Sequence, residues 1–385
     1  MLHDLKQIKW DSLKTCHGSA TEVPNRIVAL TSSDAEIRTQ ALSRLGDNLE
    51  HQGDICEVTS YVVPFLIELV SSDQTQEKAN ILNLLETVAS RWVKNRALEQ
   101  IDYSNNSSSL FEQRTYEAVR EGISIYLSLL QSEGAEIRQE AARILSLFRD
   151  NVNNTVPKLL QQVQAENDRV TKATIIWYLG KLVADNWSLL GDQLQLIQTL
   201  NTIIDSPQDK LLSYSAAITL FRLQKSEIPD KAINLVIDAI AYPQLYPTNF
   251  GDNVVAWTAC DVLCNLSLKR GIPAFGKALA VVSNSDDARY LVDALLGFAI
   301  EGKKFHDWSF LFSVGTGDNG EQIYRVGKTT VPVHTLTPYQ QEALSAILQC
   351  EQFWKTPSNL LELYGLPSSA QELKVLLDTS DPSSS

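Results

Sequence analysis

The chain has 385 residues, of which 44% are hydrophobic, and 46 acidic against 33 basic side chains give a formal net charge of −13. This charge disfavours binding to nucleic-acid phosphates and to anionic membranes and favours a basic protein partner, unless it serves solubility alone. No apolar run approaches the roughly 18 residues that a membrane span requires. The first residues lack the apolar stretch of a signal peptide, and the five cysteines are odd in number and irregularly spaced, so we expect a reduced, cytoplasmic protein.

An internal repeat begins near residue 23. A valine or isoleucine precedes proline at five places, and an apolar residue stands six positions after each of these prolines. The dipeptides are Val23-Pro24, Val63-Pro64, Val156-Pro157, Ile228-Pro229 and Ile272-Pro273. Proline is tolerated at the first position of a helix, where its missing N–H would have no partner, so each dipeptide is predicted to start a helix. Repeated helix starts predict a stacked helical array.

A second helix is predicted after each polar break that follows the first. At the first break, Ser33 and Glu36 have the spacing of a capping box, so this helix should begin near Asp34. Its pattern, Asp34–Arg38 followed by alanine and leucine, returns at Ala135–Arg138 and more loosely at Asp287–Arg289. The small alanines would allow the two helices of a pair to approach closely.

These paired segments resemble the HEAT-repeat superfamily, whose units join two antiparallel helices, with proline in the first and an Asp-to-Arg segment opening the second. The match is strongest at residues 23–46 and 122–149. The resemblance implies an all-α fold in the form of a right-handed α-solenoid of helix pairs. It also implies that Arg38, Arg138 and Arg289 are structural and form a ladder with aspartates along the stack.

Two further segments are similar to a narrower group of uncharacterised bacterial HEAT-repeat proteins. One runs from His51-Gln52-Gly53 to Val63-Pro64, and the other runs from Leu336 through Tyr339 to Pro367. The resemblance implies the same architecture and a bacterial origin. It implies no activity, because function depends on a site rather than on a fold.

The end of the array is predicted from a change of pattern after residue 304. Alternating apolar and polar residues at Trp308–Phe312 and Gln322–Val326 flank a glycine-rich turn and predict a β-hairpin. A helical pattern then returns and predicts a cap at the end of the stack. The expected divisions are an α-solenoid at 1–304, a hairpin or loop insertion at 305–335, a helical cap at 336–378 and a disordered tail at 379–385.

An aromatic segment between two predicted helices is the main candidate binding site. Tyr242, Tyr246 and Phe250 alternate with prolines and a glycine, and aromatic side chains on a loop offer contact area without disturbing the helices. Packing of these rings under the loop is the alternative. His51 is a second candidate binding residue, since it lies in an interhelical loop near Cys56, and stabilisation of that loop is its alternative role.

Other motifs support neither catalysis nor a metal. Residues Gly315–Gly320 match G-x-G-x-x-G, but a strand-like pattern follows, which predicts a hairpin turn rather than a dinucleotide site. Cys260 and Cys264 lie one helical turn apart without a second ligand pair, which favours two buried cysteines over a metal site. We find no catalytic constellation and expect no cofactor.

The function expected from these features is binding rather than reaction. The leading hypothesis is a non-enzymatic scaffold or inhibitor that grips a basic protein, and one version is an immunity protein that masks a cationic toxin. The alternative is a lyase or chaperone for a tetrapyrrole, because some phycobilin lyases are built from HEAT-like repeats. A DNA glycosylase on the same architecture is disfavoured by the acidic charge.

Overall fold

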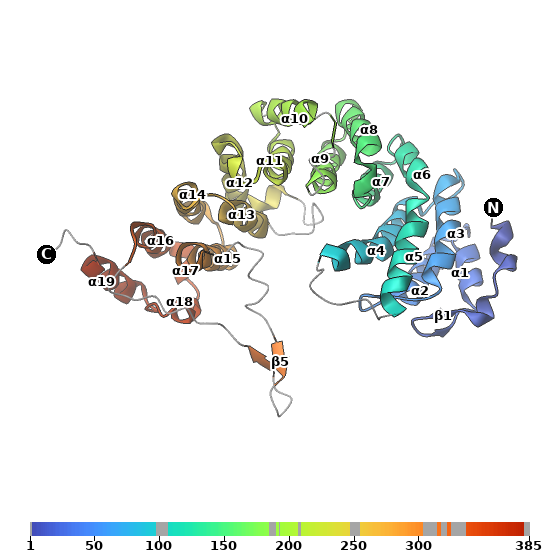
Figure 1. Ribbon diagram of the computed structural model, residues 1–385, viewed down its shortest axis with the longest axis horizontal. Helices are drawn as coiled ribbons and strands as arrows, with labels where there is room; N and C mark the ends of the chain where they lie inside the picture. The colour runs from blue at the N-terminus through green and yellow to red at the C-terminus, as the bar shows by residue number, and fades with distance from the viewer. Residues whose placement is uncertain are drawn as a thin grey trace. The chain divides into compact units, whose positions relative to one another are not determined.

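The computed structural model describes residues 2–97, 107–184, 190–191, 193–206, 209–246, 255–302, 314–316, 322–324 and 336–380. The chain is mostly helical, which confirms the all-α prediction. It divides into two compact units, Met1–Gln193 and Leu194–Ser385 (Figure 1). None of the described helices is both long enough and apolar enough to cross a membrane.

The first unit opens with two short 3-10 helices and a small hairpin, and a second small hairpin lies between α2 and α3 among the α-helices that follow. Its elements are η1 (His3–Gln7), η2 (Trp10–Ser12), β1 (Lys14–Thr15), β2 (Gly18–Ser19), α1 (Val23–Ala29), α2 (Ala35–Leu49), β3 (Glu50–His51), β4 (Asp54–Ile55), α3 (Thr59–Ser71), α4 (Lys78–Ala97), α5 (Ser107–Arg120), α6 (Ile123–Leu129), α7 (Ala135–Leu145), η3 (Arg149–Asn151), α8 (Val152–Ala165) and α9 (Arg169–Val183). Consecutive helices pack in pairs, α1 on α2, α3 on α4, α6 on α7 and α8 on α9. The helices α4, α7 and α9 also pack on one another in order, which joins neighbouring pairs.

The second unit contains two rows of helices. Its elements are α10 (Gln193–Asp205), α11 (Lys210–Gln224), η5 (Lys225–Glu227), α12 (Asp230–Ala241), η6 (Pro243–Leu245), α13 (Val255–Cys264), α14 (Leu268–Val281), α15 (Ser285–Leu296), the π-helix η7 (Gly297–Glu301), β5 (Val314–Thr316), β6 (Gln322–Tyr324), α16 (Pro338–Gln349), α17 (Glu351–Trp354), α18 (Leu360–Leu363) and α19 (Ala370–Ser380). In one row α12, α14 and α16 pack in succession, and in the other α13, α15 and α17 do so (Figure 1).

The C-terminal part contains a strand pair followed by helices. Strands β5 and β6 pair antiparallel, with Val314 opposite Tyr324. Strand β6 lies in the second predicted strand, whereas β5 includes Gly315 of the predicted turn, and the predicted strand Trp308–Phe312 lies outside the described residues. The helices α16 to α19 occupy the predicted helical cap. Helix α19 continues through Ser380, two residues past the predicted end of the cap, and residues 381–385 lie outside the described residues.

The prolines of the repeat occupy two kinds of position. Pro24 lies in the first turn of α1 and Pro229 directly precedes α12, as predicted. The prediction of a helix start is wrong for the other three, which lie inside α3, α8 and α14, namely Pro64, Pro157 and Pro273. All three side chains are exposed. The carbonyl left without a helical donor one turn earlier can therefore bond to water, which makes an interior proline tolerable.

The start of α2 is capped by a residue other than the predicted one. Asp34 has extended backbone angles, and its carboxylate accepts the N–H of Glu36 at 2.8 Å and that of Ile37 at 3.4 Å. The predicted start of the helix is confirmed, but the capping box between Ser33 and Glu36 is wrong. Ser33 stands one residue too early, and the aspartate side chain reaches the free N–H groups instead.

Arg138, at the start of α7, joins two helix pairs. Its Nη1 donates to the carbonyls of Ser132 at 2.8 Å and Glu133 at 2.9 Å, in the loop before its own helix. Its Nε and Nη2 donate to the two carboxylate oxygens of Glu166 at 2.7 and 2.9 Å. Glu166 ends α8, the first helix of the next pair. A planar guanidinium thus forms a two-pronged pair that fixes one loop against the following one.

Arg38, at the start of α2, makes similar contacts between the first two helix pairs, α1–α2 and α3–α4. Its Nη1 donates to the carbonyls of Ser32 and Ser33, and its Nε donates to Glu77, directly before α4, at 3.0 Å. The structural role implied for Arg38 and Arg138 is therefore confirmed, but their carboxylate partners are Glu77 and Glu166 rather than aspartates. Arg289 is exposed on α15. We call the contacts of Arg38 and Arg138 the arginine links.

The ionisation of Glu166 is adjusted by its surroundings. Burial alone would raise its pKa, but hydrogen bonds from Arg138, from the Asp168 backbone and from Gln162 outweigh burial, so the pKa lies below the ordinary value. A carboxylate with a lowered pKa stabilises the fold above the unfolded pKa, near 4.5. That stabilisation is lost as the pH falls through the folded pKa.

We expect Leu45→Asp to lower the free energy of unfolding by about 3–5 kcal/mol, because Leu45 is fully buried on α2 and an unpaired carboxylate would replace it. Ile37→Asp on the same helix is the matched control. Ile37 is 47% exposed and lies in the first turn, where a negative charge suits the helix dipole, so its effect should stay within about 0.5 kcal/mol. Urea denaturation measures both, and equal midpoints would show that this face of α2 is misassigned.

We expect Arg138→Ala to destabilise the protein by about 3 kcal/mol at neutral pH, because it leaves a buried carboxylate unpaired. Arg289→Ala should change stability by less than about 0.5 kcal/mol, since Arg289 is exposed. The difference in the free energy of unfolding between wild type and Arg138→Ala should decrease as the pH falls below the ordinary pKa of Glu166. Thermal melting of both proteins from neutral to acidic pH tests this. A stability difference that does not change with pH would contradict a stabilising pair between Arg138 and Glu166.

Candidate functional site

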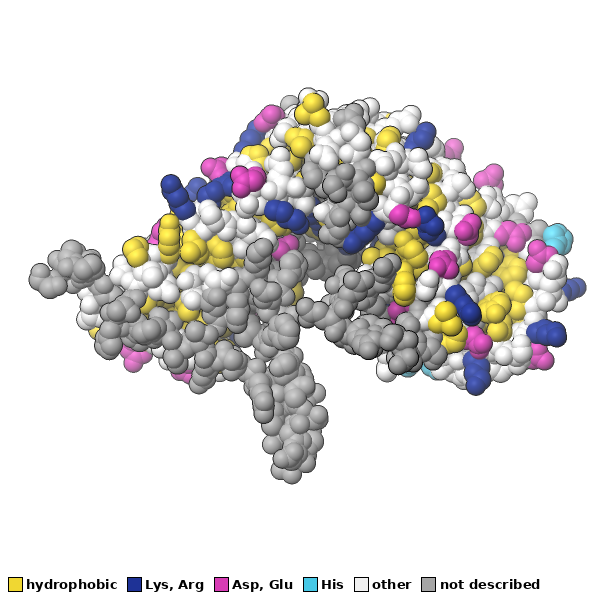
Figure 2. Space-filling view, in the orientation of Figure 1, with side chains coloured by type: hydrophobic (Ala, Val, Ile, Leu, Met, Phe, Trp, Pro, Cys, Tyr) yellow, Lys and Arg dark blue, Asp and Glu magenta, His cyan; other side chains and the backbone are white. Residues whose placement is uncertain are grey.

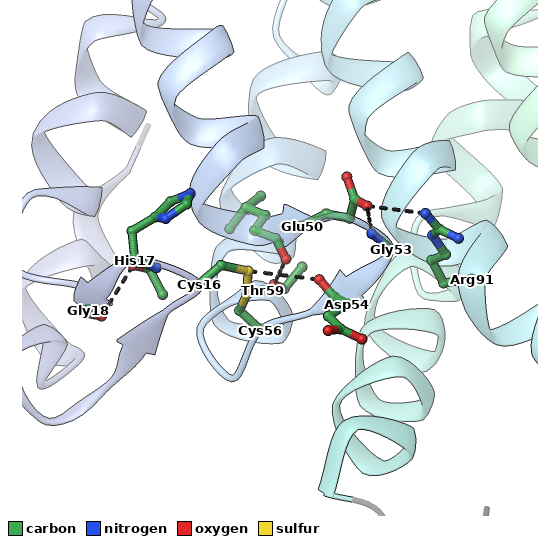
Figure 3. The surroundings of a disulfide bond; sticks show 11 residues. Cys16, His17, Gly18, Glu50, Gly53, Asp54, Cys56, Thr59 and Arg91 are labelled. Atoms are coloured by element: carbon green, nitrogen blue, oxygen red, sulfur yellow. Dashed lines mark hydrogen bonds and ion pairs between the residues drawn. A yellow bond between two sulfur atoms is a disulfide. The ribbon is translucent and has the colours of Figure 1, made fainter. Parts of the chain in front are cut away.

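The N-terminal candidate site is formed by two hairpins, β1–β2 and β3–β4, at one end of α2 (Figure 3). In the first hairpin, the Cys16 N–H donates to the Asn48 carbonyl at 3.3 Å. Directly after the second hairpin, the Cys56 N–H donates to the Leu49 carbonyl at 3.1 Å. Both hydrogen bonds end at the last residues of α2, so this helix end holds the two hairpins side by side.

The turn of the second hairpin requires a glycine. Gln52 and Gly53 have φ values of 52° and 98°, the pattern of a type I′ turn. The Gly53 N–H donates to Glu50 Oε1 at 2.5 Å, and the same oxygen accepts from Arg91 Nη2 of α4 at 3.2 Å. A Cβ at position 53 would lie 2.8 Å from Arg91 Nη2. The positive φ therefore favours glycine at position 53, and a larger residue would also require the end of the flexible Arg91 side chain to move.

Cys16 and Cys56 form a disulfide with their Cα atoms 5.5 Å apart, a separation typical of such bonds. The structure corrects the expectation of reduced cysteines for this pair. Since 40 residues separate the two positions, the bond stabilises the fold by about 4 kcal/mol on a chain-entropy argument. The free cysteines Cys260, Cys264 and Cys350 are all buried.

The candidate residue His51 lies beside His17 of the first hairpin, with ring centroids 4.8 Å apart and ring planes at 71°. Both side chains are exposed. Sequence reasoning missed His17 because only the pairing of the hairpins brings it to His51. Cys56 is oxidised in this structure, so no thiolate is present beside His51 to act as a nucleophile. The geometry therefore supports a contact between hairpins rather than a reaction.

In the aromatic segment of the second unit, Tyr242 is the exposed member, at 45%. Lys210 Nζ lies 4.5 Å from the centroid of its ring and 2.8 Å from Asp238 Oδ2. The hydrogen bond to Asp238 raises the pKa of Lys210 above its ordinary value. A tyrosine ring and a carboxylate thus hold an ammonium group of the chain itself.

The other two predicted members of this segment are placed differently. Tyr246 is only 7% exposed and packs on Tyr214, with ring centroids 4.8 Å apart. Its ring is buried in the protein, as the alternative interpretation of the sequence proposed. Phe250 lies outside the described residues. Tyr242 and Tyr246 therefore do not form one exposed cluster.

An aromatic pair that sequence reasoning missed lies on α13 and α15. Trp257 and Tyr290 are each 43% exposed, and their rings are in edge contact with centroids 5.7 Å apart. Asp286, one turn before Tyr290, is exposed, and Asp261 lies one turn after Trp257. Each ring is a single aromatic residue on its own helix, so no local pattern marks it, and only the packing of α13 on α15 creates the pair.

Cys260 and Cys264 face the helix α15 from α13. Their thiols donate to the carbonyls of Tyr290 at 3.6 Å and Ala294 at 3.8 Å. Burial raises the pKa of both thiols, so they remain protonated at neutral pH. They are buried structural cysteines, the interpretation that the sequence favoured. Of the G-x-G-x-x-G motif, Gly315 and Thr316 belong to strand β5, and the residues after them lie outside the described part.

A polar pocket of about 290 Å³ lies beside the second arginine link. Arg138 and Glu166 line it together with Gln131, Gln162 and Asp168. The charged groups are already satisfied, since Arg138 binds Glu166 and the Asp168 carboxylate accepts the backbone N–H of Thr171, capping α9. The pocket is therefore part of the structural contact between helix pairs.

Comparisons with known proteins do not assign the chain to a family. No family model matches it, and no curated protein matches it. Among solved structures, it is similar to the crystal structure of an engineered protein from a structural genomics consortium. The TM-score is 0.28 and the identity 15%, over 94% of this chain and 98% of that one. A likeness at this level supports no argument about fold or function, so the function is argued from the surface.

We expect Gly53→Ala to destabilise the first unit by about 1–2 kcal/mol, because the new side chain is strained at a positive φ and displaces Arg91 from its partly exposed ion pair with Glu50. Gly18→Ala is the matched control. Gly18 also has a positive φ, 124°, but has no atom within 4 Å of the added Cβ, so only the backbone term of about 1 kcal/mol applies. Urea denaturation compares them, and equal losses would exclude the contact with Arg91.

Proposed function

We propose that the protein is a right-handed α-solenoid of HEAT-like helix pairs that acts as a non-enzymatic scaffold or inhibitor and binds a basic protein. An immunity protein that masks a cationic toxin is one form of this function. Consecutive helix pairs and the repeated arginine links support the architectural part. The observation that carries the functional part is the exposed pair of Trp257 and Tyr290.

The aromatic pair has the properties of an interface anchor. Trp257 and Tyr290 expose a large part of their rings although both stand on helices, so the contact surface is rigid before a partner binds. Tryptophan and tyrosine are over-represented among the residues that contribute most to protein binding. The face of an aromatic ring attracts ammonium and guanidinium groups. Lys210 on the ring of Tyr242, held by Asp238, is an example within the same unit.

Carboxylates close to the aromatic pair support a basic partner. On the face shown in Figure 2, acidic and basic side chains are interspersed with hydrophobic ones, so this face is not uniformly acidic. Asp286 and Asp261 lie one turn from the aromatic pair, where a partner lysine or arginine on the rings would also meet a carboxylate. The net charge of −13 adds a long-range attraction that salt screens.

The test is affinity purification from the native cell followed by mass spectrometry, with wild type and the double variant Trp257→Ala/Tyr290→Ala as baits. We expect a basic protein to be enriched on wild type and depleted on the double variant. With that protein purified, the dissociation constant should rise at least about tenfold for the double variant, as truncation of interface anchors does. Its association should slow as the salt concentration rises.

Leu194→Ala is the control, since Leu194 is 63% exposed on α10 of the same unit and lies away from the aromatic pair in the chain. It should bind as wild type does. Equal affinity of the double variant and wild type would show that the aromatic pair is not part of the binding site. An association rate that does not change with salt concentration would contradict the argument for a basic partner. A coloured ligand in the absorption spectrum of the purified protein would instead favour the alternative, a phycobilin lyase or tetrapyrrole chaperone.

A further inference from the structure

The disulfide attaches an N-terminal segment, residues 2–22, that has little regular structure of its own. Its elements are the short helices η1 and η2 and a hairpin with two residues in each strand. Elements this short are not stable alone in water. The segment must therefore be held in place by contacts with the helices that follow it.

Noncovalent contacts place this segment on α3. The rings of Trp10 and Phe65 lie 6.2 Å apart, and the Leu2 N–H donates to Glu68 Oε1 at 2.8 Å. Directly before α3, the Val58 N–H donates to the Lys14 carbonyl at 3.1 Å. Trp10 is buried, and its Nε1 donates within the segment. The segment covers an apolar part of α3, and Cys16–Cys56 adds a covalent bond to these contacts.

Accessibility distinguishes this pair from the other cysteines. Cys16 and Cys56 are half-buried, and Cys16 directly precedes the exposed His17 (Figure 3). Cys260, Cys264 and Cys350 are buried, and burial raises the pKa of each of these thiols. A buried, protonated thiol reacts slowly, because the thiolate is the reactive form. Redox chemistry with external thiols is therefore confined to the N-terminal pair.

We infer that the Cys16–Cys56 disulfide is a site of thiol–disulfide exchange, and that its oxidation state determines how firmly residues 2–22 are held on α3. The reaction partner is a small thiol or a protein dithiol. Its thiolate attacks one sulfur, the Cys16–Cys56 bond breaks, and a mixed disulfide and one cysteine thiolate form. A second thiolate resolves the mixed disulfide. In sum, two external thiols are oxidised to a disulfide, and Cys16 and Cys56 are each reduced to a thiol.

The experiment compares the full chain purified without reductant with the same protein treated with dithiothreitol. In each state, native alkylation with mass spectrometry counts reactive cysteines, and amide hydrogen exchange follows residues 2–22, with α7 as an internal reference. We expect no alkylation before treatment, alkylation of Cys16 and Cys56 alone after it, and exchange in residues 2–22 faster by at least about tenfold, with α7 unchanged.

Variants separate the loss of the bond from other effects of the reductant. Cys16→Ser/Cys56→Ser should show the fast exchange without reductant and no further response to it, whereas Cys350→Ser should respond as wild type does. Two results would overturn the inference. One is alkylation of Cys16 and Cys56 before any reductant is added. The other is equal exchange in residues 2–22 of oxidised and reduced wild type.

Discussion

The contact on which the first unit depends most is the arginine link between helix pairs. A single pair of helices cannot bury both of its apolar faces, so it is stable only against a neighbour. Apolar packing is nondirectional and does not set the position of that neighbour. Arg138 sets it, because one rigid guanidinium must meet the carbonyls of its own loop and both oxygens of Glu166 on the next pair.

The helical class and most element positions were predictable because they depend on local sequence. Apolar periodicity, helix starts and the hairpin near residue 320 are properties of short windows. The predictions were wrong where one local pattern is compatible with two structures. Proline fits the first turn of a helix, but Pro64 shows that an exposed interior position serves as well. Ser33 and Asp34 are both good caps, and backbone angles decide for Asp34.

The candidate sites were predictable only in part because they are made by contacts between distant segments. Tyr242 is exposed as expected, whereas burial of Tyr246 depends on Tyr214 of α11, more than 30 residues earlier, which no window around the loop reveals. The pairing of Cys16 with Cys56 needs the two hairpins to meet at the end of α2. An odd number of cysteines, by contrast, argues only that one must stay free.

The covalent loop between Cys16 and Cys56 also changes how the chain would carry a mechanical load. A force applied to the two ends passes through the disulfide and bypasses the residues between them. Each residue of a stretched chain spans roughly 3.5 Å, so about 140 Å of contour length stays hidden while the bond is intact. The helices α1 and α2 are thus shielded from tension, and the first α-helix that bears it after the disulfide is α3.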